Sequence, residues 1–254
     1  MKEQFTTNVI NLKSYNISEA DKIIVMYSKE KGLIKGVAKG IKKTTSKLGG
    51  RMDMLVANKL MINKGKTLDT ICQAEALNTF FNLRSDMNKL FYAMYASEIV
   101  SNFGIENDPN SAEIYNLFYT FLEKISESKT KEHIMLSVIR FQLKIMDILG
   151  YSIELEDCVK CLKEPNSEEI YFSIEQGGIL CKDCAIDICK KVKIPRKIQE
   201  FLTAMLKEDF NTHTKYDDLA TEKVCDICIN LLKNYIEYYS PKRFKTTQML
   251  ESIR

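Results

Sequence analysis

The sequence has no long apolar run. No stretch of its 254 residues approaches the ~18 consecutive apolar residues of a membrane-spanning helix, so we expect no membrane segment. The first residues, Met1–Phe5, also lack the apolar core of a secretory signal peptide. We therefore expect a cytoplasmic protein whose thiols stay reduced. Hydrophobic residues make up 45% and charged residues 28% of the chain, which is typical of a globular protein.

Residues and motifs typical of enzymes are equally scarce. The only two histidines, His133 and His213, lie far apart in the sequence. Neither a nucleophile-elbow motif nor a zinc-protease motif occurs. Gly65-Lys66-Thr67 is similar to the end of a phosphate-binding P-loop, but Leu60 stands where that motif needs its first glycine. We therefore predict that the protein is not an enzyme.

With only 4 prolines and 10 glycines, the chain has little room for a long flexible linker. Its first part contains five short β-prone runs, at residues 5–15, 23–27, 33–41, 55–62 and 68–75. Five such strands fit a small closed barrel such as an OB-fold, and an SH3-like barrel fits the same number. In the last run Leu68, Thr70, Cys72 and Ala74 share one face, which predicts that Cys72 lies in the core.

After Leu83 the apolar residues recur with a helical period, at residues 87–99, 114–125, 134–149, 198–206 and 224–235. Ser85-Asp86, Asp108-Pro109 and Pro195 are start signals, and Gly150 is a stop signal. The helical period is interrupted at about residues 155–190. We therefore predict an α+β protein with an OB-fold β-barrel at residues 1–80. An all-α domain at residues 81–254 follows, with an inserted four-cysteine zinc knuckle at about residues 155–190.

Positive charge is concentrated near the N-terminus. Residues 1–75 hold 13 Lys and 1 Arg against 7 acidic residues, a net charge of +7, whereas the whole chain has +3. Between Lys29 and Arg51 there are eight basic residues and a single acid. Such a surface attracts phosphate backbones, although many charge runs are only solvated faces. The predicted DNA contacts are Lys35, Lys39, Lys42, Lys43, Lys47 and Arg51.

The composition of this stretch bears on how it would bind nucleic acid. Lysine acts as a point charge, whereas base recognition favours the arginine fork, so we expect little sequence preference. Gly36 and Gly40 leave the backbone open to close approach by a ligand. Phe5, Tyr15 and Tyr27 are candidate rings for base stacking, and core positions are the alternative for each of them.

The cysteines form a metal-binding pattern. Nineteen residues separate Cys158-Val-Lys-Cys161 from Cys181-Lys-Asp-Cys184, which matches a zinc site with four cysteine ligands. Two residues between paired thiolates let both sulfurs face one ion, and Gly177-Gly178 supplies a tight turn before the second pair. Four protein ligands leave no open position, so we predict one structural Zn²⁺.

The remaining cysteines do not extend this pattern. Cys189 lies five residues beyond the second pair, and we interpret it as a bystander. Cys225-Asp-Ile-Cys228 is a third C-x-x-C, but it lies within a helical stripe whose apolar face includes Cys228. A buried thiol is therefore favoured over a metal ligand there.

Several segments together resemble the RecO family of DNA repair proteins. Tyr15–Lys22 is similar to a turn of that family, and Gly32–Ile34 followed by Val37–Lys43 is similar to its "V-A-K-G-x-R/K-K" strand. Tyr171–Ser173, Gly177–Cys181 and Cys184 resemble its zinc segment, and Lys245–Leu250 resembles its terminal "L-K-S-x-x-F-L". The sequence has lysine at positions 39, 42 and 43, where many members have arginine, and some members lack the cysteines.

The resemblance implies a recombination mediator. Such a protein binds single- and double-stranded DNA through its OB-fold and anneals complementary strands. It works with RecR, engages the single-strand-binding protein through its helical domain, and helps to load RecA at gaps. The family likeness also implies a bacterial, nucleoid-associated location. The main alternative is a zinc-ribbon RNA- or transcription-related binding module. An interaction scaffold and a hydrolase with an unrecognised site are further alternatives.

Overall fold

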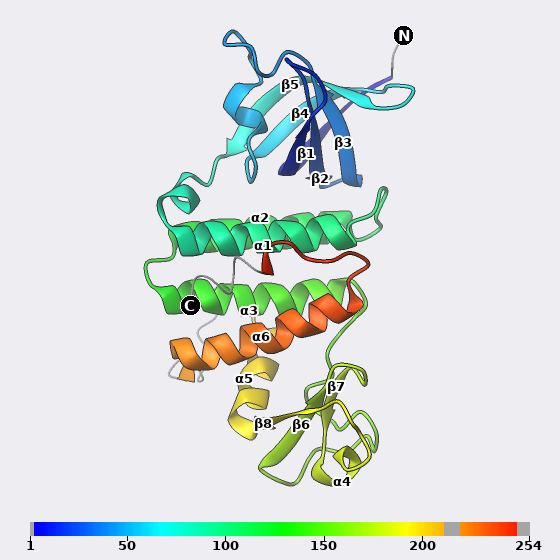
Figure 1. Cartoon of the computed structure of the whole chain (residues 1–254), viewed down its shortest axis with the longest axis vertical. Coiled ribbons are helices and arrows are strands. Elements are labelled where there is room, and N and C mark those ends of the chain that lie inside the picture. The colour runs from blue at the N-terminus through cyan, green and yellow to red at the C-terminus, as the bar shows by residue number, and fades with distance from the viewer. Residues whose placement is uncertain (1–2, 211–218, 248–254) are drawn as a thin grey trace. The chain divides into compact units, whose positions relative to one another are not determined.

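The computed structural model describes residues 3–210 and 219–247. The chain forms two compact units, which are described separately below. Unit 1 comprises Met1–Glu127 with Phe244–Arg254, and unit 2 comprises Ser128–Arg243. Figure 1 labels the helices and strands of both units. Three residues of the predicted terminal motif, 248–250, lie outside the described residues.

Unit 1 begins with a closed five-stranded barrel. Its strands are β1 (Gln4–Asn16), β2 (Lys22–Ser28), β3 (Gly32–Ala38), β4 (Ala57–Asn63) and β5 (Asp69–Asn78). They pair in the order β1-β2-β3-β5-β4, and β4 also pairs with β1. The β3–β5 pairing is parallel and the others are antiparallel. This topology confirms the predicted OB-fold. A short 3-10 helix, η1 (Gly49–Met52), lies between β3 and β4.

The barrel core is built from the inward-facing residues of the strands, and Met52 of η1 adds to it. Its fully or nearly fully buried side chains include Val9, Ile24, Met26, Leu60, Ile62 and Ile71. Alternating residues of each strand point inward, so the apolar runs of the sequence line the interior.

The prediction that Cys72 lies in the barrel core is wrong. In β5, Ile71 is buried and Cys72 is half-buried, the reverse of the expected alternation. The reason is a register shift. Leu60 pairs with Ala74 and Met61 with Gln73, but Ile62 pairs with Ile71, so Cys72 has no partner of its own. Such an unpaired residue is a β-bulge. On one side of it, the inward and outward directions of the side chains are exchanged. Ile71 and Ala74 therefore both face the core.

Two helices complete unit 1. After the short 3-10 helix η2 (Phe81–Ser85), α1 (Met87–Phe103) begins at the predicted cap, Asp86, whose carboxylate accepts hydrogen bonds from the N–H groups of residues 88 and 89. α2 (Ser111–Glu127) follows Asp108, which accepts a hydrogen bond from the hydroxyl of Tyr27 at 3.1 Å. These two helices therefore cover part of the outer surface of the barrel (Figure 1).

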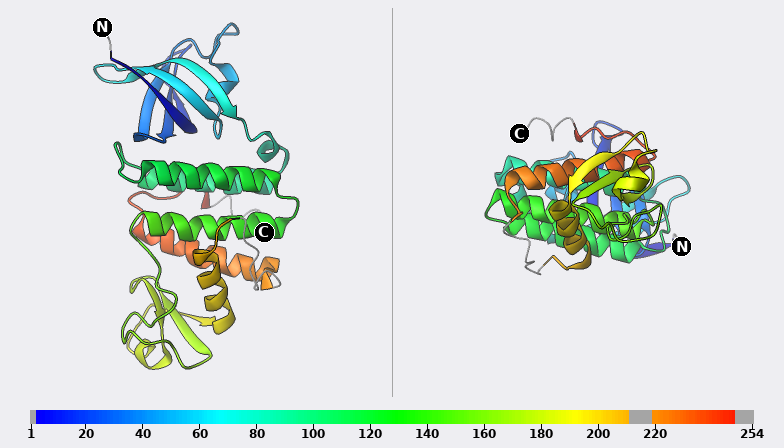
Figure 2. Two further views of the ribbon diagram at one scale, coloured as in Figure 1. Left: turned by 180° about the vertical axis from the view of Figure 1, so that it is seen from behind. Right: turned by 90° about the horizontal axis from the view of Figure 1, so that it is seen from below.

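Unit 2 combines a helical layer with a small sheet. Its helices are α3 (Lys131–Ile148), α4 (Lys182–Ala185), α5 (Arg196–Lys207) and α6 (Glu222–Tyr239). The strands β6 (Glu169–Ser173), β7 (Gly178–Leu180) and β8 (Val192–Pro195) form a sheet in the order β7-β6-β8. α3 packs against α6, and the sheet lies in the segment where the sequence loses its helical period (Figure 2). These three short strands were not predicted.

The helix boundaries of unit 2 follow local signals. Thr130 and Thr221 cap α3 and α6, each accepting a hydrogen bond from a backbone N–H of the first turn. Gly150 follows Leu149, the C-cap of α3, and has a φ of 80°, as its predicted role at a helix end requires. Among the described residues, no helix has the length and apolar character needed to cross a bilayer.

Candidate nucleic-acid interface and metal site

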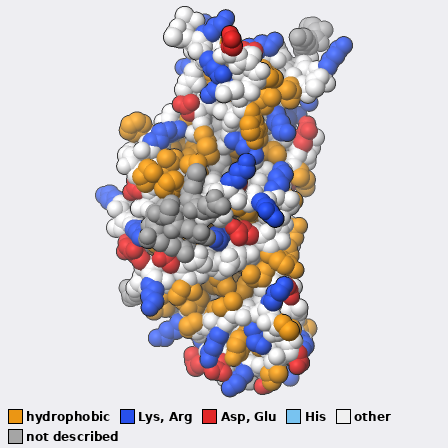
Figure 3. Space-filling model, in the orientation of Figure 1, with side chains coloured by type: hydrophobic (Ala, Val, Ile, Leu, Met, Phe, Trp, Pro, Cys, Tyr) orange, Lys and Arg blue, Asp and Glu red, His pale blue; other side chains and the backbone are white. Residues whose placement is uncertain are grey.

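The six predicted DNA contacts lie on the surface of the barrel. Lys35 projects from β3, whereas Lys39 lies just past its end at Ala38. The other four follow in the connection to β4, with Arg51 in η1. All six are exposed, and none forms an ion pair with a carboxylate of residues 3–210 or 219–247. We call these six residues the basic surface. Figure 3 shows Lys and Arg side chains on the barrel and also on the rest of this face, interspersed with other side chains.

The connection between β1 and β2, residues 17–21, holds part of the basic surface in place. Lys42 donates from its backbone N–H to the Ala20 carbonyl at 3.1 Å and from Nζ to the Ser18 carbonyl at 3.1 Å. The N–H of Gly40 donates to the Asp21 carboxylate at 2.7 Å, and Gly40 has a φ of 64°. Lys42 and the turn at Gly40 are therefore attached to this connection.

The candidate stacking rings differ in accessibility. Tyr27 is 0% exposed and hydrogen-bonded to Asp108, so of the two alternatives for this ring the core position is the correct one. Phe5 is half-buried, and the Nζ of Lys31 lies 4.7 Å from the centre of its ring. Tyr15 is 53% exposed. Tyr15 alone among the three presents its ring openly.

Two further lysines extend the cationic region. Lys64 and Lys66 lie in the β4–β5 connection and are exposed. With Lys35 they line a hollow of about 620 Å³, to which Asp69 and Glu106 also contribute. Lys66 belongs to the segment that is only partly similar to a P-loop, and neither Lys64 nor Lys66 is among the six predicted DNA contacts. The parallel pairing of β3 with β5, which brings Gly36 opposite Asp69, places this connection beside β3.

The first pair of the cysteine cluster lies in a tight loop between α3 and β6. The N–H of Leu162 donates to the Cys158 carbonyl, and the N–H of Cys158 donates to the Lys163 carbonyl, at 2.8 and 2.9 Å. Leu162 has a φ of 56°, which closes the loop. The N–H of Val159 donates to the Ile179 carbonyl in β7 at 2.9 Å, which places the first pair beside the strand that leads to the second.

The second pair flanks the start of α4. Cys181 precedes this helix, and the N–H of Ala185 donates to its carbonyl at 3.0 Å. Gly177 has a φ of 80°, as its predicted turn requires. A Cβ added to Gly178 would lie only 2.8 Å from Cβ of Glu154 and 2.9 Å from Cγ1 of Val159. The glycine therefore allows the two loops to approach closely.

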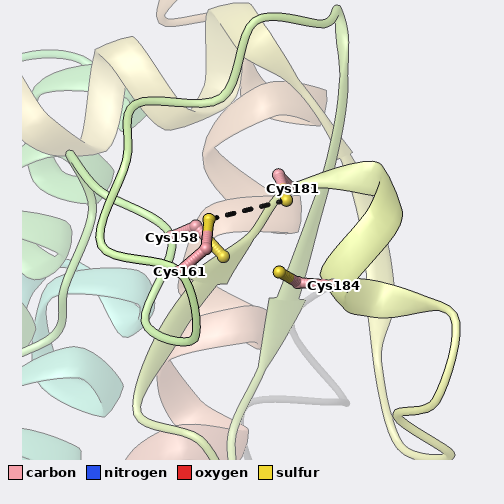
Figure 4. Close-up of side chains that lie close together, drawn as sticks. All are labelled: Cys158, Cys161, Cys181 and Cys184. Carbon is pink, nitrogen blue, oxygen red and sulfur yellow. Dashed lines mark hydrogen bonds between the residues drawn. The ribbon is translucent and has the colours of Figure 1, made fainter.

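Together these loops bring four sulfurs to one point (Figure 4). The Sγ atoms of Cys158, Cys161, Cys181 and Cys184 all lie within 4.8 Å of one another, and those of Cys161 and Cys181 are 3.9 Å apart. Zn–S bonds of about 2.3 Å in a tetrahedron place sulfurs about 3.8 Å apart. The cluster therefore has the ligand number, ligand type and spacing of a closed zinc site.

The protonation of the cluster also suits a cation. Burial of the Cys158 thiol opposes its ionisation, but backbone N–H groups of Cys161, Cys181 and Lys160 lower its pKa to about 6. The pKa of Cys184 is raised to about 12, mainly by its hydrogen bond with Cys181. One thiolate is thus favoured within the protein itself, and a bound cation would favour ionisation of the others.

The other cysteines lie apart from this cluster. Cys189 is exposed and does not belong to the group of four. Cys225 and Cys228 are both fully buried in α6, and burial raises the pKa of each thiol to about 12. The prediction of a core thiol at Cys228 is therefore confirmed.

Comparison with known proteins gives matches over almost the whole chain. Residues 1–80 match the family model described as "Recombination protein O N terminal", and residues 84–248 match "Recombination protein O C terminal". The DNA repair protein RecO of Desulforamulus reducens is 31% identical over 251 residues, covering 98% of this chain and 94% of the relative. This chain belongs to the RecO family. Membership supports a role in recombinational DNA repair.

Other RecO proteins match in the same way. The RecO protein of one Dehalococcoides mccartyi strain is 32% identical over 202 residues, with 77% of this chain and 78% of the relative covered. That of Acetivibrio thermocellus is 28% identical over 240 residues, with 94% and 91% covered. Two of the RecO-like segments of the sequence, Tyr15–Lys22 and Val37–Lys43, meet through the hydrogen bonds of Lys42 and Asp21.

Proposed function

We propose that this protein is a recombination mediator that binds single- and double-stranded DNA and anneals complementary strands. The observation that carries the proposal is the set of exposed cations on an OB-fold in a RecO family member. Within residues 3–210 and 219–247 these cations form no ion pair with a carboxylate. Lys35, Lys39, Lys42, Lys43, Lys47 and Arg51 contact phosphates in this proposal. Because the cations are mostly lysines, the protein binds with little sequence preference.

Annealing needs no ATP in this mechanism, and the protein is not an enzyme. Two DNA strands repel each other through their phosphates, and bound lysines neutralise part of that charge and release counterions. Holding two strands close together lets base pairing supply the driving free energy. The protein then acts as a cationic surface that raises the local concentration of strands.

The family also suggests partners and a location. Together with RecR, the protein helps to load RecA on gaps coated with single-strand-binding protein. The acidic tail of the single-strand-binding protein is expected to bind the helical domain, residues 81–254. The OB-fold domain at residues 1–80 would then remain available for DNA binding. We expect the protein to work in the bacterial cytoplasm at the nucleoid, where its substrate is.

The four clustered cysteines hold one structural Zn²⁺ in this proposal. Four sulfur ligands fill a tetrahedral shell, so the ion holds the two loops together and activates no water. Buried Cys158, Leu180 and Ala185 form a small core around this point, which is too small to stabilise the segment by apolar burial alone.

Annealing across a salt series tests the proposal. Complementary oligonucleotides coated with single-strand-binding protein are mixed with the full chain at increasing salt, and duplex formation is followed by energy transfer between labels. We expect fast annealing at low salt that slows as salt rises. The Lys39→Ala, Lys42→Ala, Lys43→Ala variant should anneal more slowly than the protein itself.

The matched control removes the same charge elsewhere. Lys129, Lys197 and Lys223 are exposed lysines of unit 2, and their combined change to alanine should leave the annealing of uncoated oligonucleotides unchanged, whereas the test variant should slow it as well. Equal slowing by both triple variants would reject the basic surface as the DNA site. Tight binding to RNA or to one defined sequence would favour the zinc-ribbon alternative, and the absence of salt-dependent DNA binding would favour a scaffold.

A further inference from the structure

The outer face of β1, β2 and β3 has a covered part and an open part. Cross-strand partners share a face, and the register places Ile10, Tyr27 and Leu33 in one row across these strands. This row lies against the residues that precede α2, because Tyr27 donates to Asp108 and the N–H of Leu33 donates to the Ile105 carbonyl. Helices and their connection therefore close this end of the face.

The open part contains an exposed aromatic ring. Ile23 lies four residues before Tyr27 in β2, so it is on the same face. Its cross-strand partners are Tyr15 in β1 and Val37 in β3, and these three residues form a second row. Ile23 and Val37 are half-buried, whereas Tyr15 is 53% exposed. Ile17, in the connection that follows, is 51% exposed. An apolar strip thus reaches the surface at the end of the barrel where β1 and β2 are joined.

Lysines of the basic surface border this strip. Lys35 and Lys39 lie two residues before and two residues after Val37, so they flank the β3 end of the row. Lys42 is attached to the connection after Tyr15 through Ser18. Strands are about 4.8 Å apart, so the backbone of Tyr15 lies about 10 Å from that of Val37. One short stretch of nucleic acid can therefore span the ring and the flanking ammonium groups.

We propose that Tyr15 is a stacking platform for an unpaired base, and that this contact makes the surface prefer single-stranded DNA to duplex. This inference rests on the proposed function, because the lysines must first bring the DNA backbone to the barrel. Every base has a π-face that can stack on an aromatic ring without regard to sequence. In a duplex those faces are covered by neighbouring base pairs, so only single strands gain the contact.

The first test compares affinities for the two forms of DNA. Changing Tyr15 to alanine should weaken binding of a mixed-sequence single strand by at least about fivefold. Binding of the matching duplex should change by less than about twofold. Tyr15→Phe retains a ring and should behave like the unchanged protein. The slope of affinity against salt should stay the same in both variants, because no phosphate contact is lost.

The second test uses the absence of tryptophan from the chain. Tyr15→Trp introduces a single indole reporter, and its fluorescence should be quenched when an unlabelled single strand binds and much less when a duplex binds. Tyr238→Trp is the matched control, because Tyr238 is 55% exposed and lies in unit 2. Its fluorescence should stay constant during the same titration.

The outcomes separate the two hypotheses. An equal loss of single-strand and duplex affinity in Tyr15→Ala, or no loss at all, overturns the stacking inference. So does an unquenched Tyr15→Trp under conditions where anisotropy shows that the strand is bound. In either case, salt-dependent binding that the lysine variant weakens would leave the proposed function standing. If the unchanged protein binds no DNA, both the proposed function and the inference fail.

Discussion

The salt dependence of DNA binding gives the sharpest measure of the basic surface. Each phosphate neutralised by a lysine adds about 0.7 to the slope of log affinity against log salt for single strands and about 0.9 for duplex. The variant that changes Lys39, Lys42 and Lys43 to alanine removes three exposed ammonium groups. If all three contact phosphates, the slope should become shallower by about 2 on single strands and by about 2.7 on duplex.

The structure refines this expectation for Lys42. Its Nζ already donates one hydrogen bond to the Ser18 carbonyl at 3.1 Å, which leaves two N–H donors for a phosphate. Lys42→Ala should therefore reduce the slope and also loosen the loop at residues 17–21. Lys39→Arg retains the charge, so the slope should stay as in the unchanged protein.

Fluorescence anisotropy of a labelled mixed-sequence oligonucleotide, measured from about 50 to 200 mM salt, gives the slope directly. The control with alanine at positions 129, 197 and 223 has the same net charge as the test variant and should retain the full slope. The reasoning is refuted if the test variant keeps the original slope. A comparable reduction in the control would mean that net charge, and not this surface, determines binding.

The remaining predictions concern the metal cluster and the stability of the fold. Cys161→Ser should lower the zinc content measured by plasma mass spectrometry, whereas Cys189→Ser, outside the cluster, should retain one zinc per chain. Removal of the metal by a chelator should expose residues 155–190 to proteolysis, while salt-dependent DNA binding by the barrel persists. If protease resistance and DNA binding are lost together, the metal does not have a purely local structural role. Gly178→Ala should also weaken zinc retention, because the added methyl group meets Glu154 and forces the cysteine loops apart. Asp86→Ala removes the cap of α1 and should lower the free energy of unfolding by about 1 kcal/mol in a urea titration, and an unchanged midpoint would reject that role.

The helices were predictable because their signals are local. Asp86 and Gly150 act on backbone groups within one turn of their own positions, and the apolar period of each stripe marks the buried side of its helix. The five barrel strands were predicted for the same reason. The strands β6, β7 and β8 are three to five residues long, too short to show an alternation that stands out from loop sequence.

The barrel also contains features that no local pattern specifies. Cys72 lost its predicted place in the core because the register against β4 shifts by one residue, and register depends on the partner strand. Similarly, Tyr15 and Tyr27 are both tyrosines in β-prone runs, yet one is open and the other is covered by the segment before α2. Side-chain exposure here depends on residues about 80 positions away in the chain.

The sequence by itself determined the five barrel strands, the five long helices, the excess of lysine before residue 75 and the two cysteine pairs. Propensity, charge and ligand spacing are properties of neighbouring residues. Only the tertiary structure decided that four sulfurs meet within 4.8 Å, that Lys64 and Lys66 lie beside Lys35, and that Tyr15 is the open ring among lysines. Each of these depends on strand pairing between distant segments. A pairing partner is selected by the packing of the whole barrel or sheet, which a single run of residues does not contain.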